Sequence, residues 1–244
     1  MKIIISPAKK MNIDTDSFEV FSMPKFIEKT TQIKEVLQHM SDDELQKLWK
    51  CNSEIAKLNI KRLENMDLNK NLTPAILAYQ GIQYQHLAAN ILTFGGLDYI
   101  KNHLCILSAF YGVLNPFDGV VPYRLEMQAK LEVNDHKNLY SFWGEDILPA
   151  LKSDTILNLA SKEYSKAVEP YIKNQKFITC SFAQRKEGKL VEKATMCKMA
   201  RGSMVRFLAE NNITKIEDVK EFNLMNFKYS KENSTNEKYV FLAN

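Results

Sequence analysis

Positive charge is concentrated in one short stretch of the sequence. Seven basic and two acidic residues lie between Arg185 and Arg206, so this segment carries +5, while the whole chain carries only +4. The rest of the chain therefore sums to −1. Lysine and arginine side chains neutralise phosphates and displace the counterions condensed on a double helix, and this requires no reading of bases. The segment predicts a surface that binds duplex nucleic acid.

A predicted helix over Thr195–Asn211 positions part of this charge. At 100° per residue its cationic side chains fall within an arc of roughly 140°, and a glycine lies inside that arc. Because glycine costs a helix about 1 kcal/mol, we expect another backbone to approach it closely, and a phosphodiester is one candidate. An ordinary solvated helix face is the alternative explanation of the same charges. The predicted contacts are Lys198, Arg201, Gly202, Arg206, Arg185, Lys186 and Lys189.

A second group of polar residues follows apolar runs along the chain, which is where open α/β sheets place their binding crevices. A desolvated Lys9 could serve as a Schiff-base nucleophile, whereas an exposed turn lysine is the commoner outcome. A structural ion pair between Arg124 and Glu126, with tyrosines capping the core, explains the group equally well. The predicted pocket comprises Ser6, Lys9, Tyr111, Arg124, Glu126, Asn158, Ser161, Glu163 and Tyr164.

These two groups support rival functions. The basic segment favours a DNA-binding protein without catalytic activity. The pocket around Lys9, Arg124, Glu126 and Asn158 favours a nucleic-acid-processing enzyme of the base or abasic-site glycosylase/lyase type.

Strands and loops must position the second group. Apolar runs predict buried strands over Lys2–Ile5, ended by Pro7, and over Thr155–Leu159. The run Leu104–Phe110 fits either a strand or a buried helical turn. Two prolines and two glycines predict a long loop over Gly112–Glu126.

Turn and capping signals predict the remaining elements. Capping boxes at Ser41 and Glu44, and at Thr214 and Glu217, each predict a helix start. Further expected elements are a helix from Thr73-Pro74 through Tyr79 and past Gly81, a helix over Asn138–Leu151, a hairpin joining Phe177–Phe182 to Lys189–Glu192 around Glu187-Gly188, and a final hairpin of Phe227–Tyr229 with Tyr239–Phe241.

Bulk properties narrow the class of protein. The 244 residues are 45% hydrophobic with 8 glycines and 7 prolines, which predicts a single α/β domain over residues 1–244. The start MKIIISPAKK has an apolar run too short for a signal peptide or a membrane span, and four scattered cysteines suit a reducing cytoplasm. Isolated histidines predict no metal site, and the lack of a phosphate-binding loop predicts no nucleotide cofactor. The short apolar runs predict no membrane partner.

Taken together, the chain resembles the YaaA family of bacterial peroxide stress proteins. The resemblance covers essentially the whole chain. Its motifs are Ile5-Ser6-Pro7-Ala8-Lys9, Leu107-Ser108 with Tyr111-Gly112-Val113-Leu114 and Pro116, Pro122-Tyr123-Arg124-Leu125-Glu126-Met127, Leu139-Tyr140 with Phe142-Trp143-Gly144, Asn158-Leu159-Ala160-Ser161 with Glu163-Tyr164, and Ala200-Arg201-Gly202 with Arg206-Phe207.

The resemblance implies a cytosolic protein that protects DNA during peroxide stress and is associated with lower free intracellular iron. It further implies a family-specific mixed α/β fold and a basic cleft that binds duplex or branched DNA through a C-terminal helix-hairpin-helix-like element. The glycines usual in such a hairpin are absent after the predicted helix Thr195–Asn211. Iron sequestration by direct coordination finds little support, because histidines and cysteines are not clustered, although carboxylates alone could bind iron.

Overall fold

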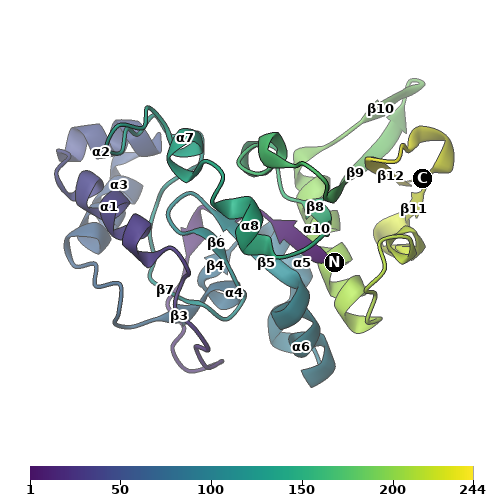
Figure 1. Cartoon of the computed structure of the whole chain (residues 1–244), viewed down its shortest axis with the longest axis horizontal. Helices are drawn as coiled ribbons and strands as arrows, with labels where there is room; N and C mark the ends of the chain where they lie inside the picture. Colours follow the sequence, from purple (N-terminus) through teal and green to yellow (C-terminus); the bar gives the residue numbers. More distant parts are fainter. Residues whose placement is uncertain (244) are drawn as a thin grey trace.

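The centre of the molecule is a mixed β-sheet whose inner strands run parallel (Figure 1). The computed structural model describes residues 1–243. Strand order is β11-β12-β9-β8-β1-β5-β6, with β10 paired to β9, and the pairs β5-β1, β1-β8, β8-β9 and β9-β12 are parallel. The strands are β1 (Lys2–Ile5), β5 (Leu104–Ser108), β6 (Gly112–Leu114), β8 (Thr155–Leu159), β9 (Lys176–Lys186), β10 (Lys189–Val191), β11 (Phe227–Tyr229) and β12 (Lys238–Ala243).

Strand β1 lies in the middle of this sheet and is buried on both faces. Ile3, Ile4 and Ile5 are fully buried, as the uninterrupted apolar run predicts for a parallel strand covered on both sides. Ile5 pairs with Ile106 of β5 and with Leu159 of β8. The strands predicted over Lys2–Ile5 and Thr155–Leu159 are therefore confirmed, and the ambiguous run after residue 103 is strand β5.

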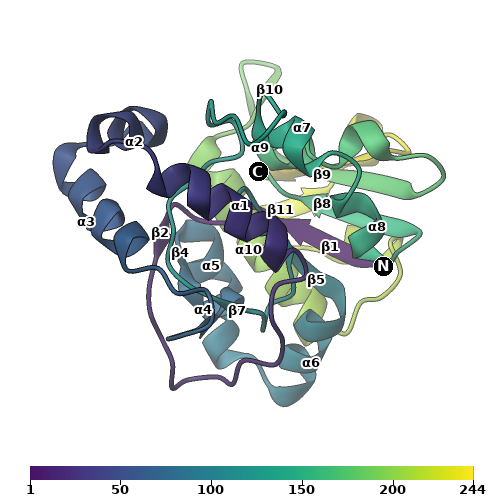
Figure 2. The same ribbon diagram turned by 60° about the vertical axis from the view of Figure 1, so that its left-hand side comes forward.

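Helices cover both faces of the sheet, and a helical lobe stands beside it (Figure 2). Helices α5, α6 and α10 lie on one face, and α8 and α9 lie over the other. The lobe consists of α1 to α3, of which α2 begins with the predicted Ser41–Glu44 capping box. The helices are α1 (Ile27–Gln38), α2 (Asp42–Trp49), α3 (Ser53–Glu64), α4 (Ala75–Ala78), α5 (Ile82–Leu87), α6 (Phe94–His103), α7 (Leu139–Trp143), α8 (Ile147–Leu151), α9 (Lys162–Ser165) and α10 (Ala194–Glu210).

Helix α10 packs directly on the backbone of α5. A Cβ atom at Gly202 would lie 2.0 Å from the carbonyl oxygen of Gln83. Only glycine allows this approach, so the backbone near Gly202 is that of Gln83, and the expectation of a phosphodiester there is wrong. The helix itself is confirmed to within one residue at each end.

Three predicted elements are divided in the structure. The helix from Pro74 ends at Ala78, because Tyr79–Gln80 forms strand β4 with β2 (Lys10–Met11). The helix predicted over Asn138–Leu151 is two helices, α7 and α8, separated at Gly144, whose φ is 45°. The loop predicted after Tyr111 contains β6 and also β7 (Gly119–Val120), which pairs with β3 (Thr73–Pro74).

The C-terminal third contains both predicted hairpins. Strands β9 and β10 join through Glu187-Gly188, both with positive φ, which is the geometry that a tight two-residue hairpin turn requires. Strands β11 and β12 pair antiparallel as predicted. The capping box at Thr214 and Glu217 is wrong: a single 3-10 turn, η3 (Asp218–Glu221), follows instead of a helix. No α-helix therefore follows α10 within residues 211–243, where the predicted C-terminal helix-hairpin-helix element needs its second helix.

Four further 3-10 turns connect the larger elements of the described chain: η1 (Ala89–Ile91), η2 (Glu169–Tyr171), η4 (Leu224–Asn226) and η5 (Lys231–Asn233). Across residues 1–243, every helix is too short or too polar to cross a lipid bilayer.

Candidate functional site

Polar side chains gather at the carboxyl ends of the parallel strands. Ser6 follows β1 and Ser161 follows β8; the Ser161 amide donates to Ser6 Oγ at 2.7 Å, and the two hydroxyls lie 3.1 Å apart. Asn158, near the end of β8, accepts from the Ala160 amide at 2.9 Å and donates to Thr179 Oγ1 at 3.1 Å. Three predicted pocket residues, Ser6, Asn158 and Ser161, thus come together at this edge because β1 and β8 are adjacent and parallel.

Two carboxylates and a lysine lie at the same edge. Lys9 Nζ contacts Glu126 Oε1 at 2.8 Å, and the Lys9 side chain is 63% exposed. The alternative ion pair of Glu126 with Arg124 is not formed. Since Lys9 is exposed and paired, the structure does not provide the desolvation that a Schiff-base lysine was expected to have.

Glu163, the second carboxylate of this cluster, is partly buried. Burial raises the pKa of the Glu163 carboxyl, the nearby Glu126 carboxylate raises it further, and the Gln128 amide and Lys9 oppose the shift. The Gln128 amide donates to Glu163 Oε1 at 3.3 Å. A carboxyl whose pKa is raised keeps its proton to a higher pH than a free glutamate does, which is the property that a general acid needs.

The predicted tyrosines are core residues. Tyr111 is almost fully buried and its hydroxyl accepts from the Val121 amide at 3.1 Å. Tyr164 is also buried, and desolvation raises the pKa of both phenols. The alternative in which tyrosines cap the core therefore describes Tyr111, which makes no polar contact with the strand-edge cluster among the described residues.

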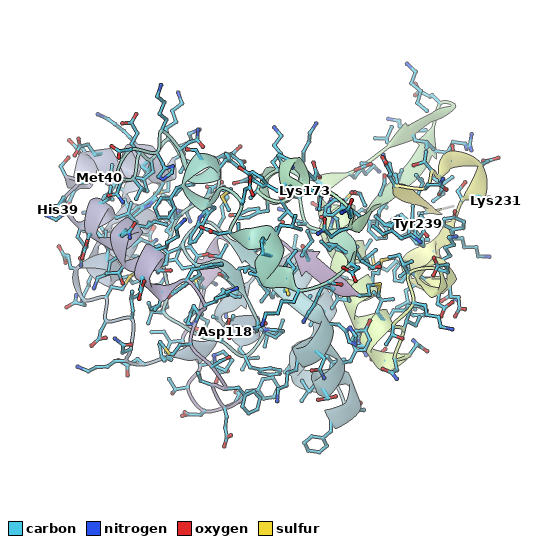
Figure 3. All side chains as sticks on the ribbon, in the orientation of Figure 1. His39, Met40, Asp118, Lys173, Lys231 and Tyr239 are labelled. Atoms are coloured by element: carbon cyan, nitrogen blue, oxygen red, sulfur yellow. The ribbon has the colours of Figure 1, made fainter. Side chains whose placement is uncertain are left out.

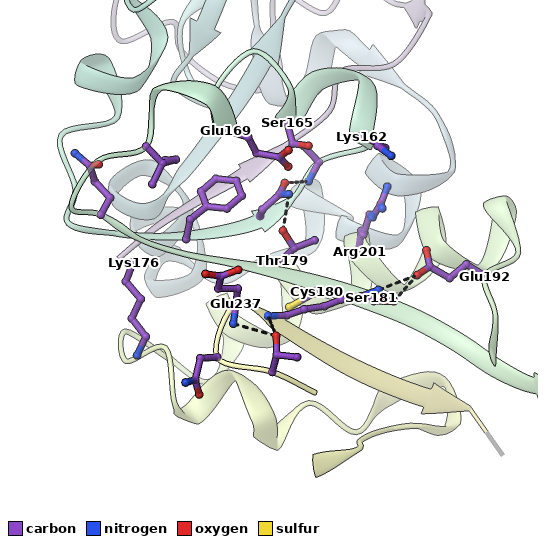
Figure 4. Close-up of a pocket in the computed structure, with 18 residues that line it drawn as sticks. Lys162, Ser165, Glu169, Lys176, Thr179, Cys180, Ser181, Glu192, Arg201 and Glu237 are labelled. Atoms are coloured by element: carbon purple, nitrogen blue, oxygen red, sulfur yellow. Dashed lines mark hydrogen bonds and ion pairs between the residues drawn. The ribbon is translucent and has the colours of Figure 1, made fainter. Parts of the chain in front are cut away.

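A cavity of about 710 Å³ opens beside this edge, over β8, β9 and the start of β12 (Figure 4). Asn158 is the member of the predicted pocket that lines it, and Arg201 is the member of the predicted DNA contacts that does. The cavity therefore joins the two groups of residues that the sequence suggested separately. Its lining includes the side chains of Asn158, Lys162, Phe177, Thr179, Ser181 and Arg201.

Arg201 is a cation of the cavity wall whose guanidinium lacks a complete set of partners in the described chain. Burial lowers the pKa of its guanidinium, and its Nε atom is buried without a hydrogen-bond partner. No carboxylate lies within ion-pair distance of it among residues 1–243. The nearby Glu192 accepts a hydrogen bond from Ser181 Oγ and lies 3.9 Å from Lys238 Nζ. Arg124 also has a buried Nε without a partner in the described structure.

The remaining predicted DNA contacts divide into paired and unpaired cations. Arg185 contacts Glu232 at 3.1 Å, and Arg206 contacts Glu210 at 2.7 Å. The hairpin β9–β10 projects from the body, and its side chains extend into solvent (Figure 3). Four lysines on this hairpin and at the start of α10 are exposed and form no ion pair among the described residues: Lys186, Lys189, Lys193 and Lys198.

Lys162 and Phe177 line the cavity but were absent from the predicted site. Phe177, Thr179 and Ser181 alternate along β9 and share one face of the strand. This alternation on one face is the feature of the sequence that could have indicated a binding surface. From the sequence, Phe177–Phe182 is interpreted only as one arm of a hairpin. In the part of the chain that the structure describes, no three histidine, cysteine or acidic side chains are placed to hold a metal ion.

Comparisons with known proteins agree over nearly the whole chain. A family model described as peroxide stress protein YaaA matches residues 1–233. A UPF0246 protein of Agathobacter rectalis is 50% identical over 244 residues, covering 99% of this chain and 98% of its own length. A UPF0246 protein of Ligilactobacillus salivarius is 50% identical over 247 residues, with full coverage of both chains. A third, from Pediococcus pentosaceus, is 48% identical and covers all of this chain and 98% of its own.

Proposed function

The chain belongs to the YaaA family of peroxide stress proteins, and on that premise we propose that it protects DNA during peroxide stress by binding duplex or branched DNA without base specificity. The observation that carries the proposal is the set of four unpaired lysines on the projecting hairpin and the start of α10. Free ammonium groups on a protruding β-ribbon can reach phosphates along a groove, whereas paired cations are already neutralised.

We propose that the hairpin and the start of α10, and not the open face of the helix, make the contact. Arg206 is paired and Arg201 turns into the cavity, so neither presents a free charge on an open helix face. Leu190 and Val191, at 40% and 37% exposure, stand between the lysines. Proteins that bend DNA use such apolar side chains as wedges between base steps.

Fluorescence anisotropy with a labelled duplex and a four-way junction tests this proposal. Replacing Lys186 and Lys189 by glutamine should weaken binding to both DNAs and reduce the slope of log affinity against log salt by roughly 2, because each lost phosphate contact removes about 0.9. The matched control replaces Lys57 and Lys61, two exposed lysines of α3, and changes the net charge equally.

Equal weakening in the hairpin variant and the α3 variant would show that only net charge matters and would overturn the hairpin assignment. No saturable binding by the unaltered protein at low salt would overturn DNA binding itself.

The proposal includes the cytoplasm as the site of action and an association with lower free intracellular iron. Because the described residues offer no cluster of metal ligands, we place the iron effect outside direct coordination by this chain. Electron paramagnetic resonance of chelated iron in cells with and without the protein measures the effect, and metal analysis of the purified protein tests direct binding.

A second candidate function is a nucleic-acid-processing enzyme of the base or abasic-site glycosylase/lyase type. The observation that favours it is the convergence of Lys9, Glu126 and Glu163 beside Ser6 and Ser161 at the strand edge. Borohydride trapping on abasic DNA tests the lyase version, and the exposed, paired Lys9 leads us to expect no adduct. Release of a damaged base, abolished by Glu163→Gln, would support a glycosylase that forms no covalent intermediate.

A further inference from the structure

We propose that the cavity around Arg201 is a binding site for one nucleotide unit, with the phosphate on Arg201 and the base against Phe177. Its volume of about 710 Å³ lies within the range of about 300–1,000 Å³ that is usual for small-molecule sites. This site is distinct from the exposed lysines of the hairpin, and a free nucleotide could occupy it whether or not the protein binds DNA.

The case for a phosphate rests on the state of Arg201. The Nε atom of Arg201 is buried without a hydrogen-bond partner, and no carboxylate of the described chain lies within ion-pair distance of the guanidinium, which is costly unless an anion completes it. Lys162 is exposed and lies on the same side of the cavity as Arg201 (Figure 4). Glu169, Glu192 and Glu237 also line the cavity, and Glu192, whose charge acts on Arg201, is held by Ser181 and Lys238. An arginine fork flanked by a lysine is a common means of binding phosphate.

The case for a base rests on strand β9. Phe177 is half-buried and lines the cavity together with Ile172, so part of its ring is available for stacking. The Thr179 hydroxyl accepts from Asn158 and therefore keeps its own proton to donate to a ligand oxygen. Along an extended strand the Cα atoms of Phe177 and Ser181 are roughly 13 Å apart. The Phe177 ring therefore lies at one end of the cavity, and Ser181 lies toward the end that holds Arg201 (Figure 4).

The nucleotide can come from two sources. Glu192 connects β10 to α10 and also lines the cavity, so the site opens next to the basic hairpin. A nucleotide at a strand end or flipped from a duplex could therefore enter it, as could a free nucleoside monophosphate. The shared chemistry is a phosphomonoester or phosphodiester with an attached base.

Isothermal titration calorimetry of the full chain with inorganic phosphate and with deoxyadenosine monophosphate tests the site. We expect saturable binding of both ligands and tighter binding of the nucleotide. Arg201→Gln should weaken both at least about tenfold, since a hydrogen bond to a charged group contributes that much. Phe177→Ala should weaken only the nucleotide. Arg206→Gln, on the same helix but paired to Glu210, is the matched control and should leave both unchanged.

The melting temperature of each variant shows whether it is folded. Arg201→Lys keeps the positive charge but loses the paired N–H donors of the guanidinium, so it should bind both ligands with intermediate affinity. Absence of saturable binding in the unaltered protein, or unchanged affinity in a folded Arg201→Gln variant, would overturn the proposal.

Binding of a DNA oligonucleotide with and without a 5′-phosphate separates the two sources of nucleotide. A strand-end nucleotide in the cavity predicts that the phosphorylated end binds more tightly and that Arg201→Gln abolishes the difference. A free mononucleotide as the occupant predicts no such difference. If the unaltered protein binds DNA but not the mononucleotide, the cavity proposal alone is rejected. If it binds the mononucleotide but not DNA, the DNA-binding proposal alone is rejected.

Discussion

At the scale of single residues, the fold opposes ionisation of the Glu163 carboxyl. Its raised pKa means that the folded protein keeps this proton to a higher pH than the unfolded chain does. The free energy of unfolding contributed by this carboxyl therefore falls as the pH rises from 4.5, the ordinary pKa of glutamate, to the raised pKa of the folded protein. Above the raised pKa this contribution no longer changes with pH.

Glu163→Gln should consequently stabilise the protein at pH 8, because glutamine resembles the protonated carboxyl, and the gain should vanish below about pH 4.5. Urea unfolding at several pH values measures it. Glu132→Gln, which removes an exposed glutamate, makes the same change in charge. Identical pH responses in the two variants would contradict a perturbed Glu163.

At the scale of elements, the contact between α10 and α5 is the most constrained packing in the fold. Gly202→Ala would place a methyl group 2.0 Å from the Gln83 carbonyl oxygen, and a backbone atom inside a helix cannot move aside easily. We expect a loss of about 1–3 kcal/mol, as for other overpacked sites, in spite of the better helix propensity of alanine.

Chemical denaturation provides the measurement, and Gly95→Ala provides the control. Gly95 lies in α6, where the nearest atom to an added Cβ is 3.9 Å away. That variant should be neutral or gain up to about 1 kcal/mol. If Gly202→Ala unfolds at the same denaturant concentration as the unaltered protein, the close packing of α10 on α5 is incorrect.

The elements that the sequence predicts well are those with a local cause. Three consecutive isoleucines predict β1, and a Glu-Gly pair between two extended segments predicts the β9–β10 turn. After Thr214 the buried apolar residues Ile216, Val219 and Phe222 recur at every third position, and this spacing suits the 3-10 turn η3 better than the α-helix that the capping pattern predicts. Glu217 instead contacts Lys176, at the start of β9, at 2.7 Å.

The candidate site was predictable only in part, for a related reason. Helical spacing places Arg201 and Gly202 on one side of α10, but it cannot tell which side faces a neighbour. That depends on α5, which lies more than a hundred residues earlier in the chain. Residues at the ends of β1 and β8 were easier to find, because parallel strands align their carboxyl ends by rule.

At the scale of the whole molecule, three of the four cysteine thiols are buried and therefore shielded from solvent. Cys105, Cys180 and Cys197 are buried, whereas Cys51 is partly exposed. Burial raises the pKa of Cys105 to about 11 and raises those of the other two buried thiols as well. Because the thiolate is the reactive form, these three should resist peroxide.

Titration of the native protein with a thiol reagent at pH 8 should therefore modify Cys51 rapidly and the other three only after unfolding, as mass spectrometry can show. Cys51→Ser should remove the rapid phase. Oxidation of Cys180 or Cys197 in the native protein by dilute peroxide would instead indicate direct redox sensing.

The central position of β1 has a consequence for how the chain reaches this structure. Ile3 pairs with Leu104 on one side and Leu157 on the other, so the middle of the sheet forms only when three distant segments meet. Such high contact order slows folding, because long loops must close before any pairing is gained. Until then the isoleucines of β1 remain open to association with other chains, and a newly made molecule should depend on chaperones most strongly at this stage.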